Sequence, residues 1–136
     1  MSEIHAAFGL VNLLKIDEFI DICYGNYTNY SYGLSGLVTN GFLSLMKYSP
    51  FSRNNYQYIV LENVQRRDEL MNFLVDHGVL ARRYFYPGCH KLPGMPNAKL
   101  PNSDRLAQEL LCLPNGVDVT EEDISKVCGL IKEFYG

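Results

Sequence analysis

The chain has 136 residues, 47% of them hydrophobic and 20% charged, so it can bury a core and does not have the composition of a disordered segment. Its formal net charge of −3 argues against a nucleic-acid partner held through phosphate contacts. No apolar run approaches the roughly 20 residues that cross a bilayer, and no basic flank marks a secretory signal, so we expect a cytoplasmic protein with no membrane partner.

The N-terminal segment predicts a long helix. Apolar residues recur at spacings of three and four over residues 4–23, which is the period of one helical face, and Ser2 is a suitable N-cap. Gly25 and the polar stretch 26–32 weaken the pattern, so we expect the helix to end gradually there. Three glycines in 33–41 then indicate a connection.

Two strands follow. Residues 42–47 suit a strand, and 56–61 form a stronger one because they are rich in aromatic and β-branched residues. The polar segment 50–55 between them predicts a turn. The two strands are close enough in sequence to pair antiparallel.

The rest of the chain predicts three helices and one more strand. A helix over 67–77 ends at a glycine, a short strand covers 79–83, and the proline-rich segment 84–100 is a loop. Asn102 or Ser103 caps a helix through Leu111. Residues 114–116 form a turn, and a last helix begins at Thr120 with Asp123 at the capping-box position.

This order places two strands in succession without a helix between them, which argues against a doubly wound parallel sheet. We therefore predict one α+β domain over residues 1–136. It would have two layers, with a small, mostly antiparallel three-stranded sheet packed by helices.

The four cysteines, Cys23, Cys89, Cys112 and Cys128, are scattered without C-x-x-C spacing. This arrangement favours free thiols over a disulfide framework and predicts no metal site.

The most informative stretch is 81–90, which combines two arginines, three aromatic residues and His90 at the end of a strand. Arginine offers a donor fork for phosphate, tyrosine hydroxyls bond oxygens, and aromatic rings stack on sugars or bases. An equally open interpretation is that the aromatic residues fill the core and the arginines are solvated. His90 has no sequence partner that marks it as a general acid or base, and Cys89 has no paired base that would activate a nucleophile.

Four segments in order resemble the C-terminal part of DegT-type sugar aminotransferases, which are fold-type-I, pyridoxal-phosphate-dependent enzymes acting on nucleotide-linked keto-sugars. The matching segments are 1–10, 55–58, 81–90, and 111–114 followed by 120–124. The resemblance implies that Tyr84 and His90, and more weakly Arg83, contact the sugar-nucleotide. The motif at 81–90 is most similar to enzymes that aminate 4-keto-6-deoxyhexoses carried on dTDP.

In this family the larger N-terminal domain carries the Schiff-base lysine and the other cofactor-binding groups. None of the lysines of this chain lies in a stretch that resembles the lysine motif. The resemblance thus implies pyridoxal phosphate in the complete enzyme, none bound to this chain alone, and no catalytic residue here. The missing large domain or a partner chain would supply the chemistry.

Two alternatives stay open at this stage. The chain could be a stand-alone module that binds a nucleotide-sugar or a protein without catalysis, or a remnant without function. In either case the first helix has apolar residues on more than one face, such as Phe8, Leu10 and Leu13, so we expect it to expose apolar surface and to mediate homo-oligomerisation.

Overall fold

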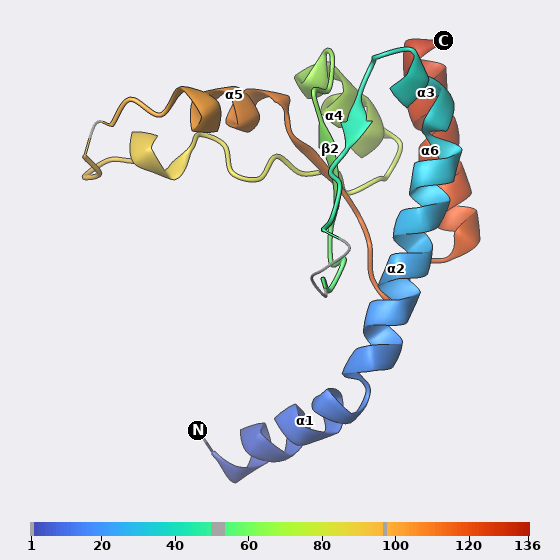
Figure 1. The fold of residues 1–136 in the computed structure, drawn as a ribbon, viewed down its shortest axis with the longest axis vertical. Helices are drawn as coiled ribbons and strands as arrows, with labels where there is room; N and C mark the ends of the chain where they lie inside the picture. The colour runs from blue at the N-terminus through green and yellow to red at the C-terminus, as the bar shows by residue number, and fades with distance from the viewer. Residues whose placement is uncertain (1, 50–53, 97) are drawn as a thin grey trace.

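Helices surround a small sheet in the computed structural model of this chain, which describes residues 2–49, 54–96 and 98–136 (Figure 1). The elements in chain order are α1 (Glu3–Leu14), α2 (Ile16–Gly33), α3 (Ser35–Thr39), β1 (Ser44–Leu45), β2 (Ile59–Glu62), α4 (Arg67–Asp76), the 3₁₀ helix η1 (Cys89–Lys91), α5 (Pro101–Glu109), β3 (Leu111–Leu113) and α6 (Glu121–Tyr135). The predicted α+β class is confirmed.

The sheet has three antiparallel strands in the order β1-β2-β3. In its centre Leu61 pairs with Leu45 on one side and with Leu111 on the other. Along β2, Ile59 and Leu61 are buried and alternate with half-buried residues, whereas β3 is buried along its whole length. The sheet therefore has one apolar face that the helices must cover.

The prediction of a strand at 79–83 was wrong, and the third strand is β3. The amide of Ala81 bonds the carbonyl of Val79 only two residues back, so the segment turns and forms a single bridge, between Arg82 and Cys112. The preceding helix was predicted to extend through Leu111, because the apolar spacing of α5 reaches that residue, and residues 112–113 were assigned to no element. All three residues are buried by tertiary contacts, and this burial favours a strand.

The N-terminal helix is two helices rather than one. At Lys15 the backbone leaves the helical conformation for one residue (φ −108°, ψ 1°), and α2 then continues to Gly33, through the segment that was expected to end it. The expected connection at 33–41 contains the short helix α3. The low helix propensity of residues 25–33 is outweighed because Asn26 and Tyr30 are buried against other parts of the chain.

Two side-chain amides, the buried Asn26 and the half-buried Asn115, connect α2 to the turn after β3. The side chain of Asn26 donates to Oδ1 of Asn115 (2.9 Å) and to the Gly116 carbonyl (3.1 Å). Asn115 in turn donates to the carbonyls of Cys23 (3.1 Å) and Tyr56 (2.7 Å). Both side-chain NH₂ groups of this pair and Oδ1 of Asn115 have partners, so the pair stabilises one packing arrangement.

Other predicted boundaries changed by a few residues. The strands predicted at 42–47 and 56–61 are shortened to β1 and β2, and residues 50–53 of the predicted turn lie outside the described residues. Helix α5 begins with Pro101 as its first residue, ahead of the expected caps. Two local predictions are confirmed, because Gly78 has φ +78° after α4 and Thr120 forms a capping box with Asp123.

Helix α1 projects from the end of α2 away from the sheet (Figure 1). None of its residues is buried, and exposed apolar side chains include Phe8 at 69%, Leu10 and Leu13 at 65% and Leu14 at 86%. The expected exposure of apolar surface is thus present. Within the described part of the chain, no helix combines the length and apolar character needed to span a membrane.

The contact between α2 and α6 leads to a prediction about two glycines of α2. A Cβ placed on Gly33 would lie 2.7 Å from Sγ of Cys128 on α6, whereas one on Gly25 would meet nothing within 4 Å. We expect Gly33→Ala to lower the free energy of unfolding by about 1–3 kcal/mol through overpacking. Gly25→Ala is the matched control and should raise it by about 0.5–1 kcal/mol, since alanine favours a helix.

Urea unfolding followed by circular dichroism measures both effects. The double variant Gly33→Ala/Cys128→Ala should recover part of the loss, because it removes the sulfur that the new methyl group meets. Equal stability changes for the two single variants would show that the close approach of the helices does not constrain position 33.

Candidate functional site

The loop after Arg82 and helix α5 form an arm that extends from the sheet, away from α2 and α6 (Figure 1). Tyr84 and His90, both predicted from the sequence, line one hollow of about 350 Å³ in this arm. Phe85 and apolar residues of α5 form further parts of its wall, including Leu106. The fold therefore brings two of the three predicted contact residues to one concave surface.

His90 is fixed in place by the beginning of α5. Its Nε2 lies 3.0 Å from Oδ1 of Asp104, and its side chain is only 9% exposed. The ammonium group of Lys91 pairs with the same carboxylate oxygen at 2.5 Å. Both partners lower the pKa of Asp104, and the bond from Lys91 has the larger effect. The carboxylate is therefore ionised at neutral pH and holds the imidazole against α5.

The packing of the His90 ring explains why residue 88, two positions earlier, is a glycine. A Cβ on Gly88 would lie 2.8 Å from Cε1 of the His90 ring, so only glycine leaves room for the imidazole in this position. Gly88 therefore helps to set the direction of the predicted ligand contact.

Tyr84 lies beside charged and aromatic neighbours. Its hydroxyl accepts a hydrogen bond from Nη1 of Arg82 at 3.0 Å, and its ring packs on Tyr58 with the ring centroids 5.3 Å apart. The bond from Arg82 is the main cause that lowers the pKa of Tyr84. A phenol in this state remains a hydrogen-bond donor with a polarised hydroxyl.

Arg83, the third predicted contact, is engaged elsewhere. Its Nη1 lies 3.2 Å from Oδ1 of Asp68, and its guanidinium stacks on Tyr86 with 4.8 Å to the ring centroid. It is not among the residues that line the hollow of Tyr84 and His90. The role of Arg83 as a ligand contact stays a prediction. In the structure its side chain attaches the loop to Asp68 at the start of α4.

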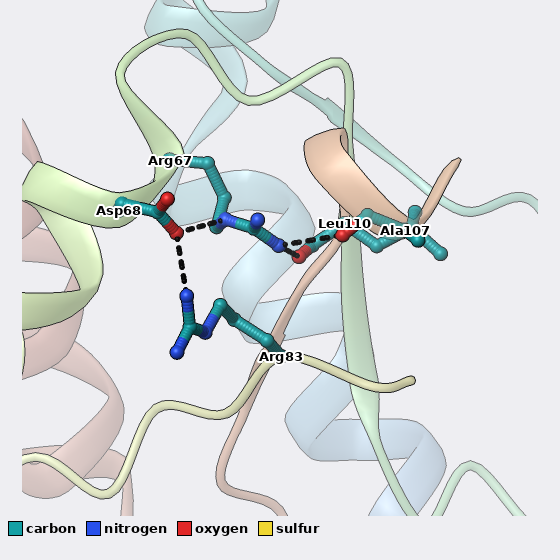
Figure 2. Close-up of polar contacts among 5 residues, drawn as sticks. All are labelled: Arg67, Asp68, Arg83, Ala107 and Leu110. Carbon is teal, nitrogen blue, oxygen red and sulfur yellow. Dashed lines mark hydrogen bonds and ion pairs between the residues drawn. The ribbon is translucent and has the colours of Figure 1, made fainter. Parts of the chain in front are cut away.

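Figure 2 shows how Asp68 lies between Arg83 and the buried Arg67. The side chain of Arg67 is 4% exposed, and its Nε lies 2.6 Å from Oδ1 of Asp68. Its Nη1 donates to the carbonyls of Ala107 and Leu110, each at 3.0 Å. One guanidinium thus joins the start of α4 to the end of α5, which carries part of the hollow.

Sequence reasoning missed three residues of this region. Arg82 is in the informative stretch but was not singled out, although it is the arginine that contacts Tyr84. Asp104 carried a signal as an acidic residue in the first turn of a predicted helix. Tyr58 lies in the family-like segment 55–58, but nothing in the sequence indicated its contact with Tyr84, because only the tertiary fold brings the two rings together.

The arrangement is suited to recognition. It offers an imidazole, phenol hydroxyls and aromatic faces at a concave surface, which are groups that bind sugar oxygens and bases. Burial raises the pKa of the Cys112 thiol, which disfavours it as a nucleophile.

Pyridoxal phosphate needs a lysine amine, phosphate-binding donors and an acid facing its pyridine nitrogen. Among the described residues, no lysine lines the hollow of Tyr84 and His90, and Lys91 beside it is paired with Asp104. A hollow between α2 and α6 contains Lys132 and Glu121, but they stand at opposite ends of one helix. The residues of these hollows do not fit the cofactor.

Comparison with known proteins identifies relatives along most of the chain. The profile described as the DegT/DnrJ/EryC1/StrS aminotransferase family matches residues 1–132. The chain is 31% identical to a dTDP-4-amino-4,6-dideoxy-D-glucose transaminase of Shigella dysenteriae, with 98% of this chain and 38% of the relative covered. It is 32% identical to a protein of the same name from Escherichia coli, with 96% and 37% covered.

The solved structures include the crystal structure of DesI in the presence of its TDP-sugar product. It is 35% identical, with a TM-score of 0.87 over 98% of this chain and 35% of that one. The chain therefore spans little more than a third of the length of the relatives that it matches.

The environment of Arg67 leads to a stability prediction. Arg67→Met leaves two carbonyls at the end of α5 without their donor, so we expect the free energy of unfolding to fall by about 3 kcal/mol. Arg105→Met is the control, because Arg105 forms an exposed ion pair with Glu109, and it should change stability by less than about 0.5 kcal/mol. Urea unfolding of both variants measures this, and equal losses would contradict an anchoring role of Arg67.

Proposed function

Because this chain belongs to the DegT/DnrJ/EryC1/StrS aminotransferase family, we propose that it acts as the C-terminal part of a pyridoxal-phosphate-dependent aminotransferase of nucleotide-linked keto-sugars. The transaminases of Shigella dysenteriae and Escherichia coli that it resembles support a dTDP-4-keto-6-deoxyhexose as the substrate. The part of the enzyme formed by this chain contributes contacts to the sugar-nucleotide.

The observation that carries the proposal is the shared hollow of Tyr84 and His90. Tyr84 offers an aromatic face and a hydroxyl, and His90 offers an imidazole whose orientation is set by Asp104. These groups bind and orient a ligand in a partly apolar wall that excludes water. Arg83 is retained as a weaker candidate contact, positioned beside Tyr86.

Pyridoxal phosphate would supply the chemistry of amino-group transfer in the complete enzyme. Since the hollow of Tyr84 and His90 and the hollow between α2 and α6 do not fit the cofactor, we assign no step of the reaction to their residues. We propose that the chain by itself does not transaminate, and that a large aminotransferase domain or a partner chain carries the Schiff-base lysine.

A ligand titration tests the proposed contacts. Calorimetry with dTDP and dTDP-sugars should show binding to the chain, weakened about fivefold by Tyr84→Phe and by His90→Gln, because each removes roughly one hydrogen bond of about 1 kcal/mol. His77→Gln is a matched control, since His77 lies at the end of α4 and bonds the Phe73 carbonyl of its own helix.

The absence of heat at millimolar ligand would remove the small-molecule function and leave a protein-binding module as the remaining alternative. Binding that all three variants share unchanged would show a nucleotide site elsewhere on the chain.

The exposed apolar surface of α1 supports a second proposal, that the chain associates with copies of itself. Sedimentation velocity should show an oligomer at high concentration, and Leu10→Lys/Leu13→Lys should shift it to the monomer by charging the apolar surface. Asn12→Lys adds a charge to the same helix without removing an apolar side chain and should leave the oligomer intact. A wild-type chain that sediments as a monomer at high concentration would refute this association.

A further inference from the structure

Asp104 determines more than the position of the His90 ring. Lys91 pairs with Oδ1 of Asp104 at 2.5 Å, and Nε2 of His90 lies 3.0 Å from the same oxygen. The ammonium group favours the ionised carboxylate, which can only accept hydrogen bonds. The contact between Nε2 and Oδ1 is therefore a hydrogen bond only when Nε2 carries the proton.

A neutral imidazole has one protonated nitrogen, so a proton on Nε2 leaves Nδ1 of His90 as an acceptor. His77 shows the opposite case. Its Nδ1 lies 2.8 Å from the Phe73 carbonyl oxygen, which is also an acceptor only, so here Nδ1 carries the proton. The chain therefore contains two imidazoles whose contacts select opposite tautomers.

Nδ1 of His90 is open to a ligand. Within the part of the chain that the structure describes, the imidazole is bonded through Nε2 and no hydrogen bond reaches Nδ1. In the same part of the chain, the one buried side-chain nitrogen or oxygen without a partner is Nε of Arg67, so Nδ1 of His90 is not sealed inside the protein. Gly88 lines the hollow together with His90, and a Cβ on it would lie 3.0 Å from Nδ1. A side chain at position 88 would cover this nitrogen, and glycine leaves it free.

We propose that Asp104 is a positioning residue that fixes the neutral imidazole of His90 as the tautomer protonated on Nε2, so that Nδ1 accepts a hydrogen bond from a hydroxyl group of the ligand. The inference rests on the proposed function for the identity of that ligand, a sugar-nucleotide. An acceptor nitrogen bonds a hydroxyl but not an ionised phosphate or carboxylate oxygen, which has no proton to donate. Asp104 thereby selects the part of the sugar-nucleotide that faces His90, and the diphosphate is excluded from this contact.

Nitrogen NMR on the full chain reads the tautomer directly. Long-range proton–nitrogen correlation spectra are recorded on the histidine-labelled chain at about pH 8.5, above the usual titration range of imidazole. We expect Nδ1 of His90 in the unprotonated range of chemical shift and Nε2 in the protonated range, with the reverse for His77. The spectrum of His90→Gln assigns the His90 signals. On addition of dTDP-glucose, Nδ1 of His90 should shift and remain in the range of an acceptor.

Asp104→Ala tests the positioning role. Without the carboxylate neither tautomer is held, so the two nitrogen shifts of His90 should move toward an average. The affinity for dTDP-glucose should fall about fivefold, as the loss of roughly one hydrogen bond implies. Asp104→Glu keeps a carboxylate and should restore part of both signals. Asp118→Ala is the matched control, because it removes the same charge from the exposed turn before α6 and should change neither. Thermal melts check that each variant is folded.

A protonated Nδ1 on His90 in the unmodified chain at this pH would overturn the inference, and so would unchanged His90 shifts in a folded Asp104→Ala variant. The same spectra keep the inference and the proposed function apart. If dTDP-glucose does not bind while the tautomer is as expected, the ligand contact fails with the proposed function and the positioning by Asp104 stands. If binding weakens in His90→Gln while Nδ1 of His90 carries the proton, the proposed contacts stand and the assignment of Nδ1 as an acceptor fails.

Discussion

The position of the site depends on the buried guanidinium of Arg67. Desolvating this charge is costly unless it is compensated. Nη1 donates to two carbonyls at the end of α5, and the carboxylate of Asp68 lies at ion-pair distance from Nε, although the buried Nε itself donates no hydrogen bond. Asp68 also pairs with Arg83, and Tyr86 lies under both guanidinium groups, with 5.3 Å and 4.8 Å to its ring centroid. The start of α4, the end of α5 and the loop between them are therefore held as one unit, and the hollow of Tyr84 and His90 lies in the arm that this unit supports.

Tyr84 connects two surfaces of different chemistry. The hollow that it shares with His90 is mainly apolar and aromatic, with an imidazole held by Asp104. A second hollow, which it shares with Arg82, contains a guanidinium without a carboxylate partner among the described residues. Among the described residues that line these two hollows there is no lysine.

The rest of the fold gives this arm a rigid base. Helices α2 and α6 approach so closely at Gly33 and Cys128 that a methyl group does not fit between them, and the Asn26–Asn115 pair fixes α2 to the turn after β3. Helix α1 lies outside this packing and keeps its apolar side chains exposed. A helix with so much exposed apolar surface is suited to pack against another protein surface. The chain covers little more than a third of the length of its relatives.

Local sequence patterns determined helix α4 with its terminal glycine and the capping box of α6, because each depends on neighbours within a few residues. The order of the predicted elements gave the α+β class and the antiparallel pairing of β1 with β2, because the two strands are separated by a short connection. The family resemblance of 81–90 implied Tyr84 and His90 as ligand contacts, and this stays a prediction. The tertiary structure alone decided that residues 111–113 form the third strand and that α2 continues past Gly25. It also decided that, among the described residues, Arg83 has a carboxylate partner and Arg82 has none. Each of those outcomes depends on burial or on a partner distant in the sequence, such as Asp68 for Arg83 and Asn115 for Asn26, and no local pattern encodes such a partner.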